Sequence, residues 1–595
     1  MRLSSNRRNA ITLGVVALVL FILYGVIRVI LMLVSLQSTI GEVQNLKVAA
    51  QNKDLGEISL GLGKAADSIA MADSSASDPI VQLFSFVPII GSDIRVASIV
   101  SSDGHLVLQA AQEVTSVANQ LVKSGVGKKP ITDTSLVSSL RDGMSALDTA
   151  VQKLNTDLAS VDETALHFGL DSKIKSAKEV VSSVAVASSR LTPLVQVGTT
   201  VIEQPGKKRW FVSIQNLAEL RGTGGITGAY AVITTEYGKL KLEEYGSDKD
   251  LLNEGRIDYK NYPQGLRNLW GADLSDWRDI NASAHAPYAA QMLADGWQQN
   301  TGQRVDGVLF IGQGVVSQLS GAVGPIDARG VLVDKDNAVE FLAKDIYARF
   351  TNVQAKDALV GELASEMFKR LIAGNFSVSG LFSAAANDKT GDRIIAWSRD
   401  KSTQQVFSKY RVSGEISTTF GPSVAVNLNN AGGNKLDAYT TLKADYLLGI
   451  CNVDTFTGYQ GRKSRVTVDL SNNSPKSGLP AYVDMRLDAN FGESRPKGSN
   501  RELLTVYGPV GSEAESITID GVAGFAINGT DRDRPLWIFD LNLLPGTTKK
   551  IVLNLVEPIN DENAEKLSGK PSLQGPVMLN APSLSSSSTG ECSLQ

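Results

Sequence analysis

Hydrophobic residues first form a charge-free run over residues 10–27, which resumes after Arg28 and ends near residue 36. About eighteen helical residues span about 27 Å, which matches the hydrocarbon core of a bilayer. A cleavable signal peptide is the competing interpretation, but the run is too long and no clear small-residue cleavage site follows it. We therefore expect residues 1–37 to hold a single-pass plasma-membrane anchor. Three basic residues precede it and predict a cytoplasmic N-terminus with an extracytoplasmic bulk: Arg2, Arg7 and Arg8.

The next hydrophobic pattern has the period of an α-helix. Apolar residues recur at steps of three or four over residues 136–161, which predicts an amphipathic helix of about 25 residues. The same spacing over residues 174–191 predicts a following helix, which we expect to end at Pro193. Residues 38–200 therefore predict an extracytoplasmic helical bundle or stalk. A coiled-coil oligomerisation role is the alternative.

The apolar segment Ile80–Ile90 interrupts this pattern. It is too short to span a bilayer, and Pro88 lies within it. We favour a place in the helical core. The alternative is that Phe84 and Phe86 rest in the outer leaflet beside the anchor.

From residue 207 the pattern changes to strands rich in aromatic and β-branched residues. Residues 209–215 and 226–235 predict a pair of core strands. Polar residues and glycines between two core strands are a common place for function. The candidate site in this turn comprises Asn216, Glu219, Arg221, Thr223, Gly224 and Gly225.

Further strands alternate with helical segments over residues 201–436, which predicts an α/β domain. Short strands separated by turns then follow, among them 465–470, 482–487 and 503–507, and they predict a β-sandwich over residues 437–558. The polar, serine-rich segment 559–595 predicts a disordered tail. The fold class is thus α+β multidomain: a transmembrane helix, a helical bundle, an α/β domain and a C-terminal β-sandwich.

Composition narrows the function classes. The net charge of -4, without a long basic run, argues against a nucleic-acid partner. Three histidines and two cysteines, all far apart in sequence, disfavour a zinc site, while carboxylates leave Mg²⁺ or Ca²⁺ open. Cys451 and Cys592 form either one disulfide outside the cell or two free thiols.

Several segments resemble the bacterial domain-of-unknown-function 4012 family. They are QNLAELRGTGGITGAYAV, the W-R-D at Trp277–Asp279, VDGVLFI, GAVGPI, the run 337–347 and GGNKLDAY at 432–439. The resemblance extends over roughly residues 200–560. It implies a membrane-tethered extracytoplasmic protein, common in actinobacteria, with no established activity.

The order of a first strand, the polar turn with Arg221, a second strand, DINASAHAPYAAQ, VDGVLFI and GAVGPI is also similar to that of the LytR-CpsA-Psr phosphotransferases. That resemblance implies a polyprenyl-pyrophosphate lipid and Mg²⁺, with transfer of a glycopolymer to the wall. Arg221 and Arg278 are the candidate phosphate donors, because guanidinium groups bind phosphate with two donors. The family's arginine–acid pair in the strand after the turn has no counterpart here, since ITGAYAVITT carries no charge. The candidate metal ligands are Asp248, Asp276 and Asp279.

Each of these groups also has a structural interpretation. Glu219 and Arg221 can form an ion pair that fixes the turn, and Trp277–Asp279 can form a salt-bridged corner. A serine hydrolase at His285 is disfavoured because no G-x-S-x-G motif lies near it. An Arg221 buried against Glu219 would weigh against catalysis.

We therefore expect a membrane-anchored cell-envelope protein with a structural or binding role, and we leave open whether it is an enzyme. The alternative is a phosphotransferase acting on a polyprenyl-pyrophosphate-linked glycopolymer. A third hypothesis is partner binding through the sandwich, which predicts an exposed apolar patch there.

Overall fold

The protein divides into two compact units, which are described separately below. Unit 1 comprises residues 1–203 with 377–387, and unit 2 comprises residues 204–376 with 388–595. The computed structural model describes residues 55–87, 90–124, 134–167, 170–350, 352–373, 377–450, 453–454, 460–488, 496–558 and 570–589, with isolated positions between 24 and 39. Cys451 and Cys592 lie outside these residues.

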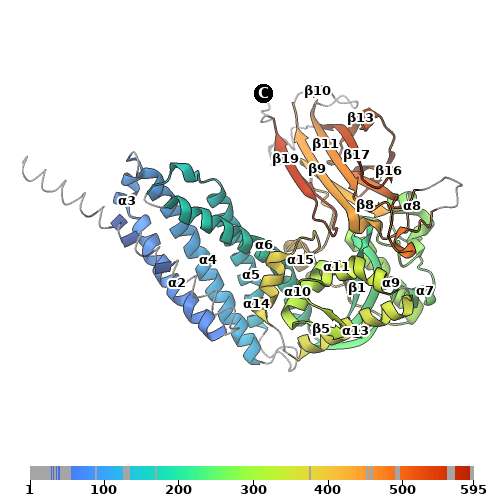
Figure 1. Ribbon diagram of the computed structural model, residues 1–595, viewed down its shortest axis with the longest axis horizontal. Helices are drawn as coiled ribbons and strands as arrows, with labels where there is room; N and C mark the ends of the chain where they lie inside the picture. The colour runs from blue at the N-terminus through green and yellow to red at the C-terminus, as the bar shows by residue number, and fades with distance from the viewer. Residues whose placement is uncertain are drawn as a thin grey trace, which may run out of the picture. The chain divides into compact units, whose positions relative to one another are not determined.

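Unit 1 is helical, as predicted for residues 38–200. Helices α2, α4, α5 and α6 lie along one another in Figure 1, and neighbours in that order α2–α4–α5–α6 are in contact. Their apolar faces meet in small clusters, one of which joins Met144 and Leu191 to Ala385 of the inserted helix α14. The helices are α2 (Leu55–Ala76), α3 (Pro79–Phe84), α4 (Gly91–Ser124), α5 (Ser135–Ala159), η1 (Glu163–Ala165), α6 (Leu170–Glu203) and α14 (Val378–Asn387).

Helix α6 corrects the prediction that Pro193 ends a helix, because the helix continues for ten residues beyond it to Glu203. Proline removes one backbone hydrogen bond, but Val197 and Val201 beyond it are buried and keep the helix in the bundle. By length and composition, α6 is also long and apolar enough to cross a membrane, and 39% of its most apolar window is buried in the structure. A core helix meets the same criterion, so this is weak evidence for a span.

The predicted anchor lies largely outside the described residues. Near its end, Arg28 forms an ion pair with Asp78 at 3.3 Å, and Met32 is buried against α2. Placing the whole segment 80–90 in the core is wrong. Val81 is buried, but Leu83 is exposed and Phe86 is 82% exposed.

Where the sequence predicts an α/β domain, unit 2 contains a mixed five-stranded sheet of order β3-β2-β1-β4-β7 together with helices. Strands β1 and β4 run parallel, and the other neighbours are antiparallel. Helix α9 (Ala286–Thr301) covers one face, where its Leu293 and Trp297 pack with Phe211 and Val308 of the sheet. The strands are β1 (Lys207–Arg221), β2 (Gly224–Glu236), β3 (Lys239–Ser247), β4 (Gly307–Ile311) and β7 (Ile395–Ser398), with a separate hairpin of β5 (Ile326–Ala328) and β6 (Val331–Val333).

The remaining helices of unit 2 surround this sheet and connect it to the C-terminal part. They are α7 (Asp248–Asn253), α8 (Gln264–Trp270), η2 (Gly271–Ser275), α10 (Gln313–Val323), α11 (Ala338–Glu340), the π-helical turn η3 (Phe341–Asp345), α12 (Ile346–Arg349), α13 (Val353–Ile372), α15 (Lys401–Lys409), η4 (Leu436–Tyr439) and α16 (Ala481–Asp484).

The C-terminal part of unit 2 contains two further sheets, as the short alternating strands predict. One has the order β15-β16-β12-β8-β18, and the other β14-β13-β17-β11-β9-β19, with β10 beside β11. Leu504 and Phe539 of the first sheet share one buried core with Val468 and Leu553 of the second. The strands are β8 (Ser423–Asn430), β9 (Thr440–Leu448), β10 (Val453–Asp454), β11 (Gln460–Asn472), β12 (Asn500–Tyr507), β13 (Glu513–Ile519), β14 (Val522–Ala523), β15 (Ile527–Asp531), β16 (Arg534–Leu543), β17 (Thr547–Pro558), β18 (Ser572–Gln574) and β19 (Ser583–Ser588).

Three details differ from the sequence-based expectations. The sandwich includes β8 and so begins before residue 437. The expected strand 482–487 instead begins within the short helix α16. The expected disordered tail contains two strands, because β18 and β19 pair with β8 and β9 at the sheet edges. Backbone hydrogen bonds to an open edge explain how a serine-rich segment with few apolar residues forms a strand.

Candidate functional site

The turn between β1 and β2 is far tighter than the irregular loop that the sequence predicts. Pairing resumes at Leu220 and Arg221, so only Gly222 and Thr223 connect the strands, and a bulge lies between Asn216 and Leu220. Gly222 packs so closely on the backbone of Ser283 that an added Cβ would lie 2.3 Å from its carbonyl oxygen. Gly224 has φ of +139°, a conformation that glycine readily adopts.

The other polar residues of the turn form hydrogen bonds with one another and with neighbouring residues. Thr223 Oγ1 accepts hydrogen bonds from Gln215 (2.7 Å) and Asn281 (2.9 Å), and Asn281 also donates to the carbonyl of Gly225 at 3.0 Å. The Asn216 amide donates to Tyr347 Oη and accepts from Gln313 at 2.9 Å. These predicted site residues therefore fix the backbone of the turn.

Arg221 is buried, with a side chain 8% exposed, and protein acceptors surround its whole guanidinium group. Nε donates to Asp279 (3.0 Å), and Nη2 approaches Asp279 (2.8 Å) and Glu219 (3.1 Å). Nη1 donates to the carbonyl oxygens of Leu220 (2.9 Å) and Asn430 (3.1 Å). All three guanidinium nitrogens therefore donate to protein acceptors, and two carboxylates pair with the charge, so the group is directed at the protein and not at a phosphate.

A second set of buried residues joins the turn to the sandwich. Lys435 Nζ forms an ion pair with Glu219, and Asp437 accepts from the backbone N–H of Leu220 at 2.5 Å. Asn500 donates to Asp437 (2.6 Å) and to Glu502 (2.7 Å). We call the whole set the buried polar cluster: Glu219, Arg221, Asp279, Asn430, Asn434, Lys435, Asp437, Asn500 and Glu502.

Acids outnumber bases in the buried polar cluster. Burial raises the pKa of Asp437, and burial together with the Asp437 charge raises the pKa of Glu502 well above its usual value. Within the described residues no donor reaches Glu502 Oε2, which fits a protonated Glu502 hydrogen-bonded to Asp437. Burial also acts to raise the pKa of Glu219, but Lys435 and Arg221 outweigh it and lower that pKa. The cluster is therefore not a positively charged site for an anion.

Arg278 and the three candidate metal ligands each have protein partners and do not form one site. Arg278 binds Asp276 through Nε (3.0 Å) and Nη2 (2.9 Å), and its side chain is 39% exposed. Asp279 forms an ion pair with Arg221. Asp248, at the start of α7, has a pKa raised by burial and opposed by Lys356. Among the residues that the structure describes, no group of three or more acidic, histidine or cysteine side chains has the arrangement of a metal site. The structure does not bring these three aspartates together as Mg²⁺ ligands.

His285 is buried and neutral, because burial and Arg532 lower its pKa to about 3. Its Nδ1 accepts from the backbone N–H of Ile416 at 3.1 Å. Ser283 Oγ donates to Asp531 at 3.0 Å and accepts from the backbone N–H of His285 at 3.1 Å. Since the hydroxyl points to Asp531 and not to the imidazole, these residues do not form a nucleophile–base pair.

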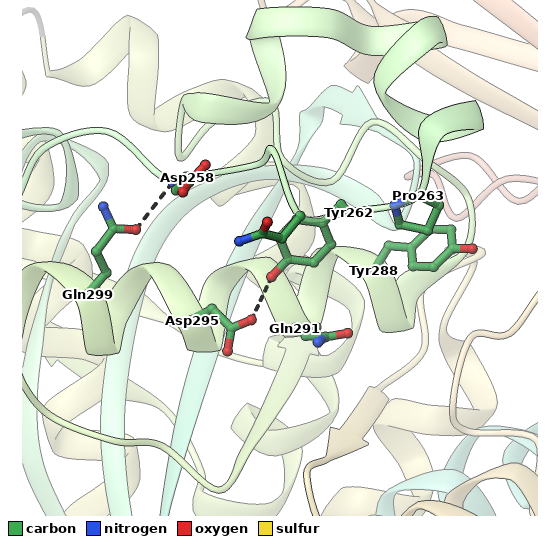
Figure 2. Close-up of a pocket in the computed structure, with 8 residues that line it drawn as sticks. Asp258, Tyr262, Pro263, Tyr288, Gln291, Asp295 and Gln299 are labelled. Carbon is green, nitrogen blue, oxygen red and sulfur yellow. Dashed lines mark hydrogen bonds between the residues drawn. The ribbon is translucent and has the colours of Figure 1, made fainter.

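Two open cavities of unit 2 lie beside α9. One of about 340 Å³ is lined by Tyr262, Tyr288, Gln291 and Asp295 among others (Figure 2). A second of about 560 Å³ shares Pro263 and Tyr288 with the first and continues to Arg532. We call the two together the Tyr288 groove. The complete lining is Asp258, Asn261, Tyr262, Pro263, Gly265, Leu266, Tyr288, Gln291, Asp295, Gln299, Thr418, Thr530, Asp531, Arg532 and Asp533.

Sequence reasoning missed this groove and six of the nine residues of the buried polar cluster. The signal for the groove was present in α9, where Tyr288, Gln291, Asp295 and Gln299 follow at steps of three and four among buried alanines. Such steps place polar side chains on one helix face. Asn500 and Glu502 give no comparable local signal.

Comparison with known proteins identifies a family but no relative of known role. Residues 205–347 match the family described as "Protein of unknown function (DUF4012)", so the chain carries a domain of this family. No curated protein and no solved structure matches the chain. These comparisons do not support a similarity to LytR-CpsA-Psr proteins or an actinobacterial origin. The matched segment runs from β1 to Tyr347 and includes the turn and α9.

Proposed function

We propose that this chain is a membrane-anchored, extracytoplasmic protein of the cell envelope with a structural or binding role. The observation that carries the proposal is the engagement of Arg221 by Glu219, Asp279 and backbone carbonyls. A phosphotransferase needs free guanidinium donors and a cation at the phosphate. The turn offers neither a free guanidinium donor nor a cation. Its polar residues are better explained as the contacts that connect the family domain to the sandwich.

The membrane location rests on the charge-free run 10–27 and on exposed apolar residues at the end of α3 and just after it. Leu83, Phe86 and Val87 are exposed, and Asp78 at the start of α3 binds both Tyr24 (2.9 Å) and Arg28 from the end of the predicted anchor. Apolar side chains beside an anchor are suited to the outer leaflet.

The experiment supplies purified full-length protein in nanodiscs with a polyprenyl-pyrophosphate-linked oligosaccharide and Mg²⁺. It also measures co-sedimentation of the same protein with insoluble cell-wall polymer. We expect no consumption of the lipid-linked substrate and retention on the polymer. Consumption of the substrate that is lost in Arg278→Ala, with the fold intact, would restore the phosphotransferase alternative.

Partner binding through the sandwich is a second candidate, and one observation favours it. Val522, Phe525 and Ile527 are 70%, 80% and 51% exposed and lie close together in sequence around the β14–β15 connection. Adhesion through this patch predicts that Phe525→Ser abolishes polymer retention without changing the unfolding temperature. Retention that persists in Phe525→Ser would exclude the patch as the binding surface.

A further inference from the structure

We propose that the Tyr288 groove binds a neutral, hydroxyl-rich ligand of the oligosaccharide class. The inference deepens the proposed binding role and rests on it, but it depends on different residues from those of the buried polar cluster. It begins with the shape of the site. Tyr288, Gln291, Asp295 and Gln299 lie along one face of α9 and cover about 16 Å of helix at 1.5 Å per residue. That length suits several linked rings better than one.

The first cavity offers unused polar groups. Figure 2 shows Gln291 and Asp295 of α9 facing the segment that carries Asp258 and Tyr262. Asp295 is already engaged, since Tyr262 Oη (2.7 Å) and Arg399 (2.5 Å) both donate to it. By contrast, the exposed amides of Asn261 and Gln291 make no hydrogen bond to any described residue. An amide supplies both donors and an acceptor, which is the combination that a hydroxyl group needs.

The second cavity is lined by an arginine, Arg532, that has one donor without a partner among the described residues. Arg532 and Asp533 form the tight turn between β15 and β16, both with positive φ (55° and 59°). Non-glycine residues in this conformation are strained and concentrate at functional sites. The turn brings Arg532 Nη1 to 3.0 Å from His285 Nε2, and Arg532 Nε has no partner among the described residues.

The contact between Arg532 and His285 is not a satisfied hydrogen bond. Because Ile416 N–H donates to Nδ1, the neutral ring carries its proton at Nε2. Two N–H groups then face each other; Arg532 also forms a hydrogen bond with Tyr288, and only its Nε has no partner among the described residues, beside the cavity that both side chains line. An oxygen acceptor from a ligand would use this Nε–H group.

The charge around Arg532 selects a neutral acceptor. Asp531 and Asp533 flank it in the chain, and Asp258 and Asp295 line the neighbouring cavity. Aspartates outnumber arginines in this lining even though Asp295 is paired with Arg399, and this excess disfavours a phosphate or carboxylate polymer by charge repulsion. Between the cavities, Pro263 and the half-buried ring of Tyr288 form an apolar ridge. Tyrosine presents an apolar ring with a polar tip, which suits the C–H face of a sugar ring between its hydroxyl groups.

The test is isothermal titration calorimetry of the full-length protein with soluble N-acetylated chitin oligomers, neutral glucan oligomers, inorganic pyrophosphate and a lysine-rich peptide. We expect saturable binding of an oligosaccharide that weakens at least tenfold in Tyr288→Ala and in Gln291→Ala. Gln298→Ala is the matched control, because Gln298 is exposed on the same helix but lines neither cavity. Thermal unfolding confirms that each variant is folded.

Three results would overturn the inference: no oligosaccharide binds, binding is unchanged in both groove variants, or only the lysine-rich peptide binds. The last would indicate a cationic ligand attracted by the aspartates. Retention on cell-wall polymer distinguishes a failure of the groove proposal from a failure of the proposed binding role. Retention that persists in Tyr288→Ala and Gln291→Ala refutes the groove and leaves the binding role standing, whereas a wild-type protein that is not retained on the polymer contradicts the binding role itself.

Discussion

The buried polar cluster and the Tyr288 groove both contain arginine and aspartate, but they use them in opposite ways. In the cluster all three guanidinium nitrogens of Arg221 donate to protein acceptors, and the side chain is buried. In the groove Arg532 faces another N–H group, and the Gln291 amide has no partner among the described residues. Buried polar groups that are satisfied stabilise one structure, whereas unsatisfied groups beside a cavity are available to a ligand. The density of charge in the sequence does not distinguish the two.

The largest expected effect is that of removing Arg221. Arg221→Ala leaves the buried Glu219 beside a void and removes the partner of the partly exposed Asp279, and breaking a buried ion pair costs about 3–5 kcal/mol. Urea unfolding of the full-length protein, followed by tryptophan fluorescence, measures the loss. Arg278→Ala is the control, because the partly exposed pair with Asp276 is worth at most about 1 kcal/mol. Equal losses for the two variants would contradict the structural role of Arg221.

A somewhat smaller effect is expected at Gly222. A Cβ there would lie within 2.4 Å of backbone atoms of Ala282 and Ser283, so Gly222→Ala forces the turn away from this segment. Overpacking of this kind costs about 1–3 kcal/mol. Gly198→Ala in α6 has no atom within 4 Å of its new Cβ and should stabilise its helix slightly. Differential scanning calorimetry compares the two, and an unchanged transition in Gly222→Ala would refute the close packing.

Protonation of Glu502 makes the stability of the protein depend on pH. Its pKa is raised in the folded protein, by burial and then by Asp437, so the folded state holds the proton more tightly than the unfolded state. Stability is therefore fully present below the unfolded pKa, about 4.3, and is lost as the pH rises through the folded pKa. Glu502→Gln keeps a neutral donor toward Asp437 and should remove this loss.

The difference in unfolding free energy between Glu502→Gln and wild type, measured by urea at pH 5 and pH 8, isolates this group from the other titrating residues. We expect Glu502→Gln to gain stability relative to wild type as the pH rises. Each pKa unit of elevation corresponds to about 1.4 kcal/mol. A difference that does not vary with pH would mean that Glu502 is not held protonated.

The smallest effect on stability is expected in the groove. Gln291 is exposed and makes no hydrogen bond to a described residue, so Gln291→Ala should change the unfolding free energy by less than about 0.5 kcal/mol while it weakens oligosaccharide binding. Measuring both quantities on one preparation sharpens the contrast with Arg221→Ala. A large loss of stability in Gln291→Ala would show that its amide has a structural role.

Local patterns were sufficient to predict the elements but not their long-range contacts. The β-branched and aromatic runs predicted β1 and β2, and the spacing over 136–161 predicted α5, because both patterns reflect burial within one element. The prediction that a helix ends at Pro193 was wrong because packing of α6 in the bundle outweighed the loss of one backbone hydrogen bond at the proline. The prediction of a disordered tail was wrong because residues far away in sequence form the edges of the two sheets, and these edges provide hydrogen bonds to the tail.

The same limit applies to the sites. The sequence pointed to Glu219, Arg221 and Asp279, yet their role depends on Lys435 and Asp437, and Lys435 lies 216 positions from Glu219. The local ion pair of Arg221 with Glu219 was anticipated, but nothing local in the sequence shows that Asp279 and Asn430 would bind Arg221 as well. The groove had a local signal in α9, but the strained Arg532–Asp533 turn that completes it belongs to a hairpin in the sandwich.

Hydrogen–deuterium exchange of the full-length protein, with and without a saturating oligosaccharide, compares the two regions in one measurement. The proposal predicts slower exchange in peptides covering residues 258–270 and 286–299, which carry the groove, and no change in residues 216–225 and 430–439, which carry the cluster. Protection confined to the turn and the cluster, with no change beside α9, would contradict the assignment of structure to one region and binding to the other.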